Sequence, residues 1–201
     1  MLDNFTLIIL TYNRYNYLQR NLEFYLEYKL KFKIIILDSS TIVITKNIKN
    51  LIDNNNNVKL FKLDSNIDFF EKIQKGVKVV DTDFCAISAD DDFLMPSMFE
   101  KCIKFLTKNP LYSSAHGLHF NHKKIDFNSR EFILMYQLYH NSAISNDNHD
   151  EFERIKKYLE GNIKYYPIYA VTRRTTLGKI INLVNKYTKN MELKEYIFTI
   201  F

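Results

Sequence analysis

The chain has 201 residues, of which 46% are hydrophobic and 25% are charged, which is typical of a globular protein with room for one domain and a substantial core. Four glycines and three prolines exclude collagen-like, proline-rich and glycine-linker classes, and the glycines are too widely spaced for a glycine-rich phosphate loop. The formal net charge of +5 leaves an anionic ligand open, but the lysines are scattered, so nucleic-acid binding is the weakest function class.

The sequence contains neither a recognisable signal peptide nor a stretch that would span a membrane. Asp3 and Asn4 precede only a short apolar run, and no apolar stretch approaches the ~18–20 residues of a spanning helix. We therefore expect a cytoplasmic protein. Cys85 and Cys102 lie in apolar stretches and are expected to be buried free thiols, because two cysteines make neither a disulfide framework nor a cysteine zinc site.

Short apolar runs alternate with helical patterns in the first half of the chain. We expect strands at residues 6–10, 34–37, 58–63 and 84–87. Helices are expected over residues 18–26 (with an Asn16–Gln19 capping box), 41–52, 68–80 and from Pro96 onward, where Phe99, Ile103 and Leu106 would face inward. This alternation predicts an α/β fold with a mostly parallel sheet flanked by helices, and the alternating third strand is expected nearer an edge.

After Pro110 the pattern is looser. We expect strands at residues 113–122 and 165–171, and helices at 128–140, 151–160, 175–187 and 191–200. A polar loop is expected at residues 141–150. The last four residues, 198–201, are apolar and carry no cap, which predicts a chain cut before a larger unit ends.

Polar residues follow three of the predicted strands, at Thr11–Arg14, Asp38–Ser40 and Asp90–Asp92. Ligands of open α/β sheets bind beyond the carboxyl ends of the strands, so these clusters would meet at one rim if the strands are neighbours. Three consecutive aspartates repel one another unless a cation offsets them, and a divalent cation such as Mg²⁺ or Mn²⁺ is the natural partner. The alternative, equally open, is a solvated acidic turn that caps the helix starting near Pro96.

Other residues in these clusters suit a nucleotide. Asp38 can accept hydrogen bonds from a ribose hydroxyl or a base, or it can act as a turn residue. Thr11, Asn13 and Arg14 offer donors to a base or phosphate, or they begin a helix. Lys72 lies in the helix predicted before the strand that leads to Asp90–Asp92, and it can reach a phosphate. A lysine at such a position is more commonly exposed to solvent.

Histidines and tyrosines give weaker signals. His116, His119 and His122 are spaced by three, so on a strand only the first and last share a face, which disfavours a three-ligand zinc site. The tyrosines within 12–17 and 165–169 are more often core than a stacking platform, and if exposed they can stack on a base or sugar ring.

Three motifs together resemble family 2 glycosyltransferases. The run Thr6–Arg14, ending in Thr-Tyr-Asn-Arg, resembles the opening strand of the family, and Leu37–Ser40 resembles its second-strand aspartate. Ile87–Pro96 resembles its D-x-D region, including the proline after three intervening residues. The resemblance covers the first half of the chain and implies the GT-A nucleotide-diphosphosugar transferase fold. Residues 1–201 would form a single GT-A-like domain, with a nucleotide-binding half to about 110 and an acceptor-side half from 111.

The resemblance also implies roles for single residues. The donor site, to which we add Lys72, would comprise Thr11, Tyr12, Asn13, Arg14, Asp38, Lys72, Asp90 and Asp91. The Mn²⁺ or Mg²⁺ ligands would be Asp90, Asp91 and Asp92, and the ion would bridge the two phosphates of a nucleotide-diphosphate sugar. The general base would be Glu192, with Glu195 as the alternative. The chain departs from the family pattern at Ala89, where Asp is common, and in lacking an Asp directly after Glu192.

The function implied is a metal-dependent, inverting glycosyltransferase that transfers a sugar to a hydroxyl acceptor of a carbohydrate or lipid-linked molecule, such as a surface glycan or polysaccharide precursor. Peripheral membrane association stays open, and the sequence does not predict an oligomeric state. One alternative is a truncated, non-catalytic remnant that still binds nucleotide. A nucleotidyltransferase is disfavoured because the chain has no early glycine-rich phosphate loop.

Overall fold

The computed structural model describes residues 2–28, 31–127, 130–137, 145–161 and 167–200. Internal contacts divide the chain into two compact units. Unit 1 contains the residues up to 116 together with 167–199, and unit 2 contains residues 117–166.

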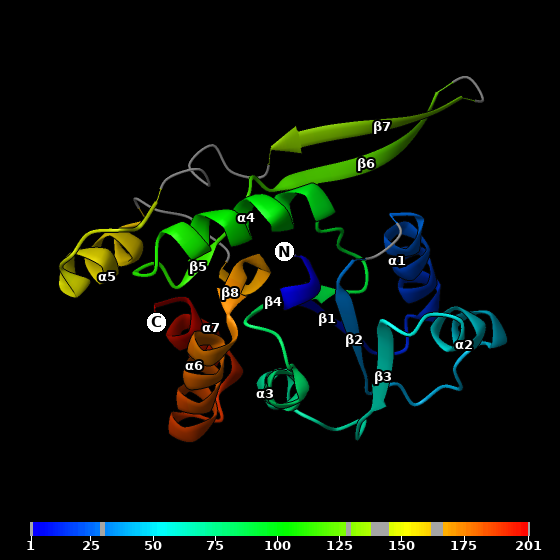
Figure 1. Ribbon diagram of the computed structural model, residues 1–201, viewed down its shortest axis with the longest axis horizontal. Helices are drawn as coiled ribbons and strands as arrows, with labels where there is room; N and C mark the ends of the chain where they lie inside the picture. The colour runs from blue at the N-terminus through cyan, green and yellow to red at the C-terminus, as the bar shows by residue number, and fades with distance from the viewer. Residues whose placement is uncertain (1, 29–30, 128–129, 138–144, 162–166, 201) are drawn as a thin grey trace. The chain divides into compact units, whose positions relative to one another are not determined.

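Unit 1 is built on a six-stranded sheet with the strand order β3-β2-β1-β4-β8-β5 (Figure 1). The parallel strands are β1 (Phe5–Thr11), β2 (Lys33–Asp38), β3 (Val58–Lys62) and β4 (Phe84–Ala89). The antiparallel strands are β8 (Val171–Arg173), which pairs with β4, and β5 (Ser114–Ala115), which pairs with β8. The mostly parallel α/β sheet is therefore confirmed, and so is the placement of the third predicted strand at an edge.

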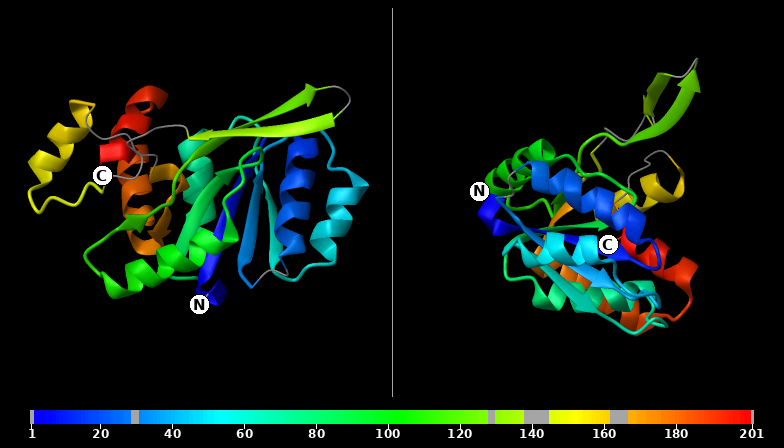
Figure 2. Two further views of the ribbon diagram at one scale, coloured as in Figure 1. Left: turned by 90° about the horizontal axis from the view of Figure 1, so that it is seen from above. Right: turned by 90° about the vertical axis from the view of Figure 1, so that its right-hand side faces the viewer.

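Helices cover both faces of this sheet (Figure 2). The core on one face is formed with α1 (Tyr15–Glu27), α2 (Lys46–Asp53) and α4 (Pro96–Lys108). The core on the other face is formed with α3 (Phe69–Val79), α6 (Arg174–Tyr187) and α7 (Met191–Ile200). Within β1, Leu7 and Ile9 enter the first core while Ile8 and Leu10 enter the second, which is why the whole strand is apolar. Cys85 and Cys102 are buried free thiols, as predicted.

Local signals explain where several helices begin. The Asp68 carboxylate accepts hydrogen bonds from the backbone N–H groups of Phe70 and Glu71, so the predicted cap of α3 is confirmed. Pro96 occupies the first turn of α4, also as predicted. Thr45 caps α2, which therefore begins at Lys46, later than expected.

The capping box expected at the start of α1 does not form. The residue at the N-cap is Arg14, which makes no side-chain capping bond. The side chain of Gln19 instead donates to Glu23, one turn further along the helix.

Unit 2 contains the hairpin of β6 (Phe120–Phe127) and β7 (Arg130–Gln137), and the helix α5 (Glu151–Leu159). The helix expected at 128–140 is wrong over residues 130–137, because this aromatic and β-branched run pairs with β6. Helix α5 is as predicted: Asp150 caps its start, and Gly161, just beyond its end, has a positive φ of 71°.

Two strands of the second half differ from the prediction. The strand expected at 113–122 is divided between the two-residue β5 and the start of β6. Of the strand expected at 165–171, residues 167–169 form the 3₁₀ turn η2 (Pro167–Tyr169) and β8 begins only at Val171, while 165 and 166 lie outside the described residues. A further 3₁₀ turn, η1 (Leu2–Asn4), precedes β1.

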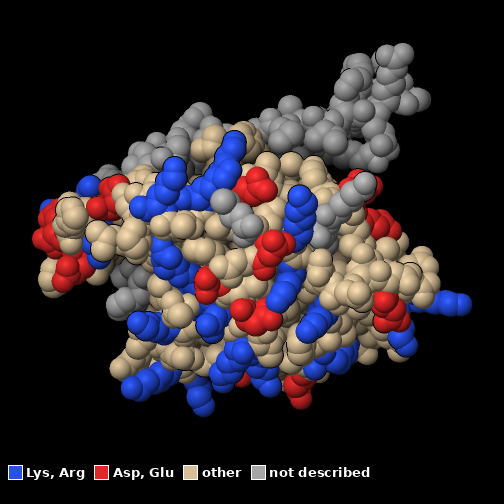
Figure 3. All heavy atoms as spheres, viewed as in Figure 1, with Lys and Arg blue, Asp and Glu red and all other residues tan. Residues whose placement is uncertain are grey.

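Charged side chains of both signs are interspersed on the face shown in Figure 3, in keeping with the scattered lysines of the sequence. Within the described residues, no helix combines the length and the apolar character that crossing a membrane requires.

Candidate functional site

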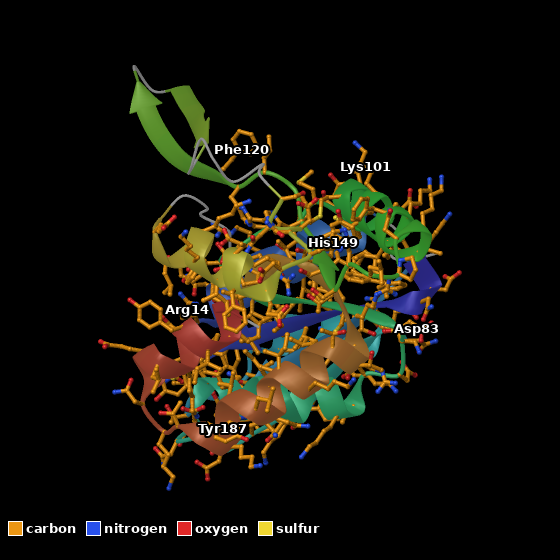
Figure 4. The ribbon with its side chains drawn as sticks, turned by 90° about the vertical axis from the view of Figure 1, so that its left-hand side faces the viewer. Arg14, Asp83, Lys101, Phe120, His149 and Tyr187 are labelled. Atoms are coloured by element: carbon orange, nitrogen blue, oxygen red, sulfur yellow. The ribbon has the colours of Figure 1, made fainter. Side chains whose placement is uncertain are left out.

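The candidate site lies where the strand order reverses. The chain builds the sheet outward from β1 to β2 and β3, then returns to place β4 on the other side of β1. Thr11 is in register with Asp38 of β2, and Leu10 with Ala89 of β4, so all three strands end at the same edge. Figure 4 shows Arg14 and Asp83 at opposite ends of the sheet, the former at this carboxyl edge. Open α/β sheets bind ligands at such a switch point.

The loop after β1 is held in an unusual backbone conformation. Asn13 has a positive φ of 56°, which asparagine tolerates better than most residues. Its Oδ1 accepts hydrogen bonds from the backbone N–H groups of Thr41 at 2.8 Å and Ile42 at 3.3 Å, and its own N–H donates to Oγ of Ser40 at 2.8 Å. Tyr12 is exposed beside it. These bonds tie the loop after β1 to the loop after β2.

The acidic segment, Asp90–Asp92, is not uniformly exposed. The Asp90 side chain is 0% exposed and accepts a 2.7 Å hydrogen bond from Oγ1 of Thr11. Its other oxygen, Oδ1, is buried and lies 2.5 Å from Nη2 of Arg14 without a hydrogen bond of good geometry. Burial raises the pKa of Asp90, and the charge of Asp91 adds to this, while Thr11 and Arg14 oppose it.

Arg14 binds the carboxylate of Asp91 through two nitrogens of its guanidinium. Nη1 donates to Oδ2 of Asp91 at 2.9 Å, and Nη2 donates to Oδ1 at 3.3 Å. Burial alone would lower the pKa of Arg14, but the charges of Asp90 and Asp91 outweigh it, and the pKa is raised. Asp92 is half-buried, and its backbone carbonyl accepts a 2.6 Å hydrogen bond from Nδ2 of Asn21.

The carboxylate of Asp38 is buried among three partners, of which the backbone of Ser40 is the one expected of a turn residue, whereas Tyr15 and Lys62 were not predicted. Its carboxylate accepts hydrogen bonds from the Tyr15 hydroxyl at 2.6 Å, from Nζ of Lys62 at 3.0 Å and from the backbone N–H of Ser40 at 2.8 Å. Burial would raise the pKa of Asp38, but the hydrogen bonds from Ser40, Tyr15 and Lys62 outweigh it and lower the pKa. Lys62 stands opposite Asp38 in the register of β2 and β3. Because that pairing depends on sheet order, no local signal points to it.

Lys72 lies beneath the same edge. It is 5% exposed, and its ammonium donates to the carbonyl of Thr11 at 2.6 Å and to Oγ of Ser39 at 2.9 Å. Burial lowers its pKa to about 8, against the opposing charges of Asp38 and Asp90. The alternative of a solvent-exposed lysine is therefore wrong: this cation joins the ends of β1 and β2.

The two predicted base residues lie on α7. Glu192 and Glu195 are both exposed. The helix is anchored between them by the buried Lys194, whose ammonium donates to Asp68 at 2.9 Å and to Oδ1 of Asn185 at 3.1 Å. Since Asp68 caps the start of α3, which follows β3 at the carboxyl edge, this bond places the first turn of α7 at the same edge of the sheet.

The described residues suit a divalent cation only if a ligand completes its coordination. No group of three His, Cys, Asp or Glu side chains arranged to hold a metal occurs among them. Asp90 is committed to Thr11 and Arg14, whereas Asp91 is 40% exposed and Asp92 is half-buried. Mg²⁺ and Mn²⁺ commonly take one or two protein carboxylates together with water and phosphate oxygens, so Asp91 and Asp92 fit such a shared ion. His116 and His119 are half-buried, and the side chain of His122 lies outside the described part.

In a comparison with known families, residues 6–180 match the family described as Glycosyl transferase family 2. A search of curated proteins found no match.

Among solved structures, Staphylococcus aureus TarS 1–349 in complex with UDP is similar over 97% of this chain and 52% of that chain, with a TM-score of 0.56 and 18% identity. A second structure of TarS 1–349 matches 53% of this chain and 33% of that chain, with a TM-score of 0.46 and 20% identity. The mannosyltransferase PcManGT from Pyrobaculum calidifontis, in complex with GDP-Man and Mn²⁺, matches 55% of this chain and 34% of that chain, with a TM-score of 0.46 and 13% identity. The chain thus spans about half of these proteins or less, and the first likeness supports the GT-A fold.

Proposed function

Because the chain belongs to glycosyl transferase family 2, we propose that it transfers a sugar from a nucleotide-diphosphate donor to a hydroxyl acceptor. The observation that carries this proposal is the meeting of Thr11, Arg14 and the acidic segment where the strand order reverses. An acidic segment held beside two cations, Arg14 and Lys72, is suited to a ligand that brings phosphate and a divalent ion together.

We assign the nucleotide to the edge formed by the ends of β1, β2 and β4. Tyr12 is exposed there and offers a ring face on which a base can stack. The loop conformation at Asn13, the next residue, fixes the direction in which the chain leaves Tyr12. Asp38 already accepts hydrogen bonds from Tyr15, Lys62 and Ser40, so its main part in this proposal is to fix the shape of the pocket. Its two oxygens retain lone pairs for a ribose or base donor.

The chemistry of transfer requires stabilisation of the leaving diphosphate. A Mn²⁺ or Mg²⁺ ion held by Asp91 and Asp92 supplies Lewis-acid stabilisation of that charge when it is bound with the donor. Arg14 and Lys72 add positive charge at the same edge and orient the loop that faces the donor. Attack by the acceptor hydroxyl on the face opposite the diphosphate inverts the sugar carbon.

The acceptor hydroxyl needs a base. We assign this role to Glu192, with Glu195 as the alternative, because Lys194 binds α7 to the start of α3 at the carboxyl edge. The acceptor is proposed to be a carbohydrate or lipid-linked molecule, such as a precursor of a surface glycan.

Isothermal titration with nucleoside diphosphates and Mn²⁺ tests the proposal. UDP and GDP are the first ligands to try, since they are, respectively, the ligand and the nucleotide part of the ligand in two similar structures. We expect saturable binding that strengthens with Mn²⁺ and weakens about tenfold or more in Asp91→Asn/Asp92→Asn. Asp83→Asn, at the opposite end of the sheet, is the matched control and should bind as the wild type does.

Absence of binding with and without Mn²⁺ would contradict the donor assignment. Binding without turnover across many donors and acceptors would instead favour the nucleotide-binding remnant. If turnover is found, its survival in Glu192→Gln/Glu195→Gln would exclude both residues as the base.

A further inference from the structure

The guanidinium of Arg14 already occupies the place where a cation would meet the acidic segment. Nη1 and Nη2 engage both oxygens of Asp91, at 2.9 and 3.3 Å, and Nη2 also lies 2.5 Å from Oδ1 of Asp90. One arginine therefore pairs with two neighbouring carboxylates, and its single positive charge offsets only one of their two negative charges. Any other cation that binds Asp91 has to compete with this arginine for the same oxygens.

Two of the three carboxylates differ in how easily they can change partner. Asp90 is 0% exposed and is held by Thr11 as well as by Arg14, so it has no solvent side. Asp91 is 40% exposed, so water reaches its carboxylate, and exchanging its partner leaves no charge buried and unpaired. Competition between Arg14 and a divalent cation is therefore expected at Asp91, while Asp90 keeps the arginine close by.

The backbone of Arg14 is held by hydrogen bonds on both sides, whereas its side chain is partly exposed. Its carbonyl accepts the hydrogen bonds of Tyr17 and Leu18 that begin α1, at 3.0 and 3.2 Å. The preceding loop is tied to Thr41 and Ile42 through Asn13. The Arg14 side chain itself is 43% exposed. Its guanidinium lies 5.6 Å from the centre of the Tyr17 ring, and this ring face is a second group that can bind the guanidinium.

We propose that Arg14 is a built-in counter-ion of the acidic segment, which a divalent cation displaces from Asp91, and that the displaced guanidinium then binds a phosphate of the donor. This inference rests on the proposed function, because it assigns the freed guanidinium to the diphosphate of a nucleotide sugar. Guanidinium groups bind phosphate with the same two-armed geometry that Arg14 shows toward Asp91.

A thermodynamic consequence follows. A divalent cation alone has to break the Arg14–Asp91 pair without compensation, so it binds weakly. A cation that arrives with a diphosphate gives Arg14 a new anion, so the two ligands strengthen each other's binding. Removing Arg14 should therefore tighten the binding of the cation alone and reduce its coupling to the nucleotide.

The test uses Mn²⁺ alone, followed by the loss of its free-ion electron paramagnetic resonance signal. We expect Arg14→Gln to bind Mn²⁺ about fivefold or more tightly than the wild type, because the competing charge is gone. Arg20→Gln is the matched control: it also removes one positive charge, but from within α1, the helix that Arg14 precedes, where Arg20 lies over the rings of Tyr17 and Phe93. It should leave Mn²⁺ affinity within about twofold.

An Arg14→Gln chain whose Mn²⁺ affinity is unchanged or weaker overturns the proposal, and so does an equal tightening in Arg20→Gln. Circular dichroism checks that each variant folds. If Arg14→Gln does not fold, Arg14→Lys replaces it. The lysine keeps the charge but cannot donate to both oxygens of Asp91 as the guanidinium does, so Mn²⁺ should bind more tightly than in the wild type, by less than the roughly fivefold increase expected for Arg14→Gln. Equal affinity in the lysine variant would then overturn the proposal.

A second titration, of UDP or GDP with and without Mn²⁺, separates this inference from the proposed function. Nucleotide binding in the wild type, with no change of coupling in Arg14→Gln, refutes the counter-ion role and leaves the transferase proposal standing. Tighter Mn²⁺ binding in Arg14→Gln, with no nucleotide bound by any chain, supports displacement and refutes the donor assignment.

Discussion

At the scale of single residues, the ammonium of Lys72 is buried at the candidate site. It donates to the carbonyl of Thr11 and to Oγ of Ser39, so it joins the ends of two parallel strands. Both partners are neutral, and the carboxylates of Asp38 and Asp90 act on Lys72 only through their charge. This explains why burial prevails and the pKa of Lys72 falls to about 8.

The lowered pKa of Lys72 predicts a rise of stability with pH. Between the folded pKa of about 8 and the ordinary value of 10.5, the unfolded chain binds more protons than the folded one, so the free energy of unfolding increases with pH. From pH 7 to pH 10 we expect the wild type to gain about 2 kcal/mol relative to Lys72→Met. Urea unfolding of both chains at several pH values measures this difference.

Lys62 provides the control for that measurement. Burial would lower the pKa of Lys62, but its bond to Asp38 outweighs this and raises the pKa. The stability that Lys62 contributes is therefore complete below pH 10.5 and is lost only as pH rises through its higher folded pKa. The difference between the wild type and Lys62→Met should not increase from pH 7 to pH 10. A Lys72 comparison that is equally flat would show that its ammonium is not destabilised by burial.

The sequence indicated which residue types belong to the site but not how they pair. Arg14 and Asp91 are 77 residues apart, and Lys72 and Thr11 are 61 residues apart. Such pairs depend on the strand order, which local patterns do not encode. Lys62 was missed as a partner of Asp38 for the same reason, since it faces Asp38 only once β2 and β3 pair in parallel register.

At the scale of elements, strands buried on both faces were the easiest to predict. Three apolar runs in the first half became β1, β2 and β4, because a continuous apolar run has few other ways to be buried, and the alternating run at residues 58–63 became the edge strand β3. The error at residues 130–137 has the opposite origin. A cap-like pattern at 128–131 favoured a helix locally, while the energy of pairing with β6 comes from another part of the chain.

Gly76 shows how closely α3 approaches the sheet. A Cβ atom at this position would lie 2.5 Å from Cδ1 of Leu37 and 3.2 Å from Cγ2 of Ile8, both in buried side chains. Alanine normally stabilises a helix by about 1 kcal/mol relative to glycine, but here it has to displace the core beneath Asp38. We expect Gly76→Ala to lower the free energy of unfolding by about 1 kcal/mol and to weaken nucleotide binding.

Gly178 in α6 is the matched control for this substitution. Its Cβ would meet Cγ1 of Val77 at 3.6 Å, an ordinary contact. Gly178→Ala should therefore raise the free energy of unfolding by about 0.5–1 kcal/mol in the same urea titration. If both variants are stabilised equally, α3 is not packed against the sheet as closely as described.

At the scale of the whole molecule, the candidate donor site belongs to one of the two units. The six-stranded sheet, both described core clusters and the contacts around the acidic segment all come from residues up to 116 and from 167–199. The chain returns to this sheet through β8, which fills the place between β4 and β5. Nucleotide binding is therefore expected to depend on unit 1 alone.

Replacing residues 117–166 with a flexible glycine–serine linker tests this dependence. The cores of unit 1 are built without the replaced segment, and loop-closure entropy changes slowly with loop length, so we expect the shortened chain to fold. Its affinity for a nucleoside diphosphate with Mn²⁺ should stay within about threefold of that of the full chain. Circular dichroism, urea unfolding and isothermal titration provide the readouts. A folded chain that no longer binds nucleotide would assign part of the donor site to residues 117–166, and a chain that does not fold would show that unit 1 depends on unit 2 for its stability.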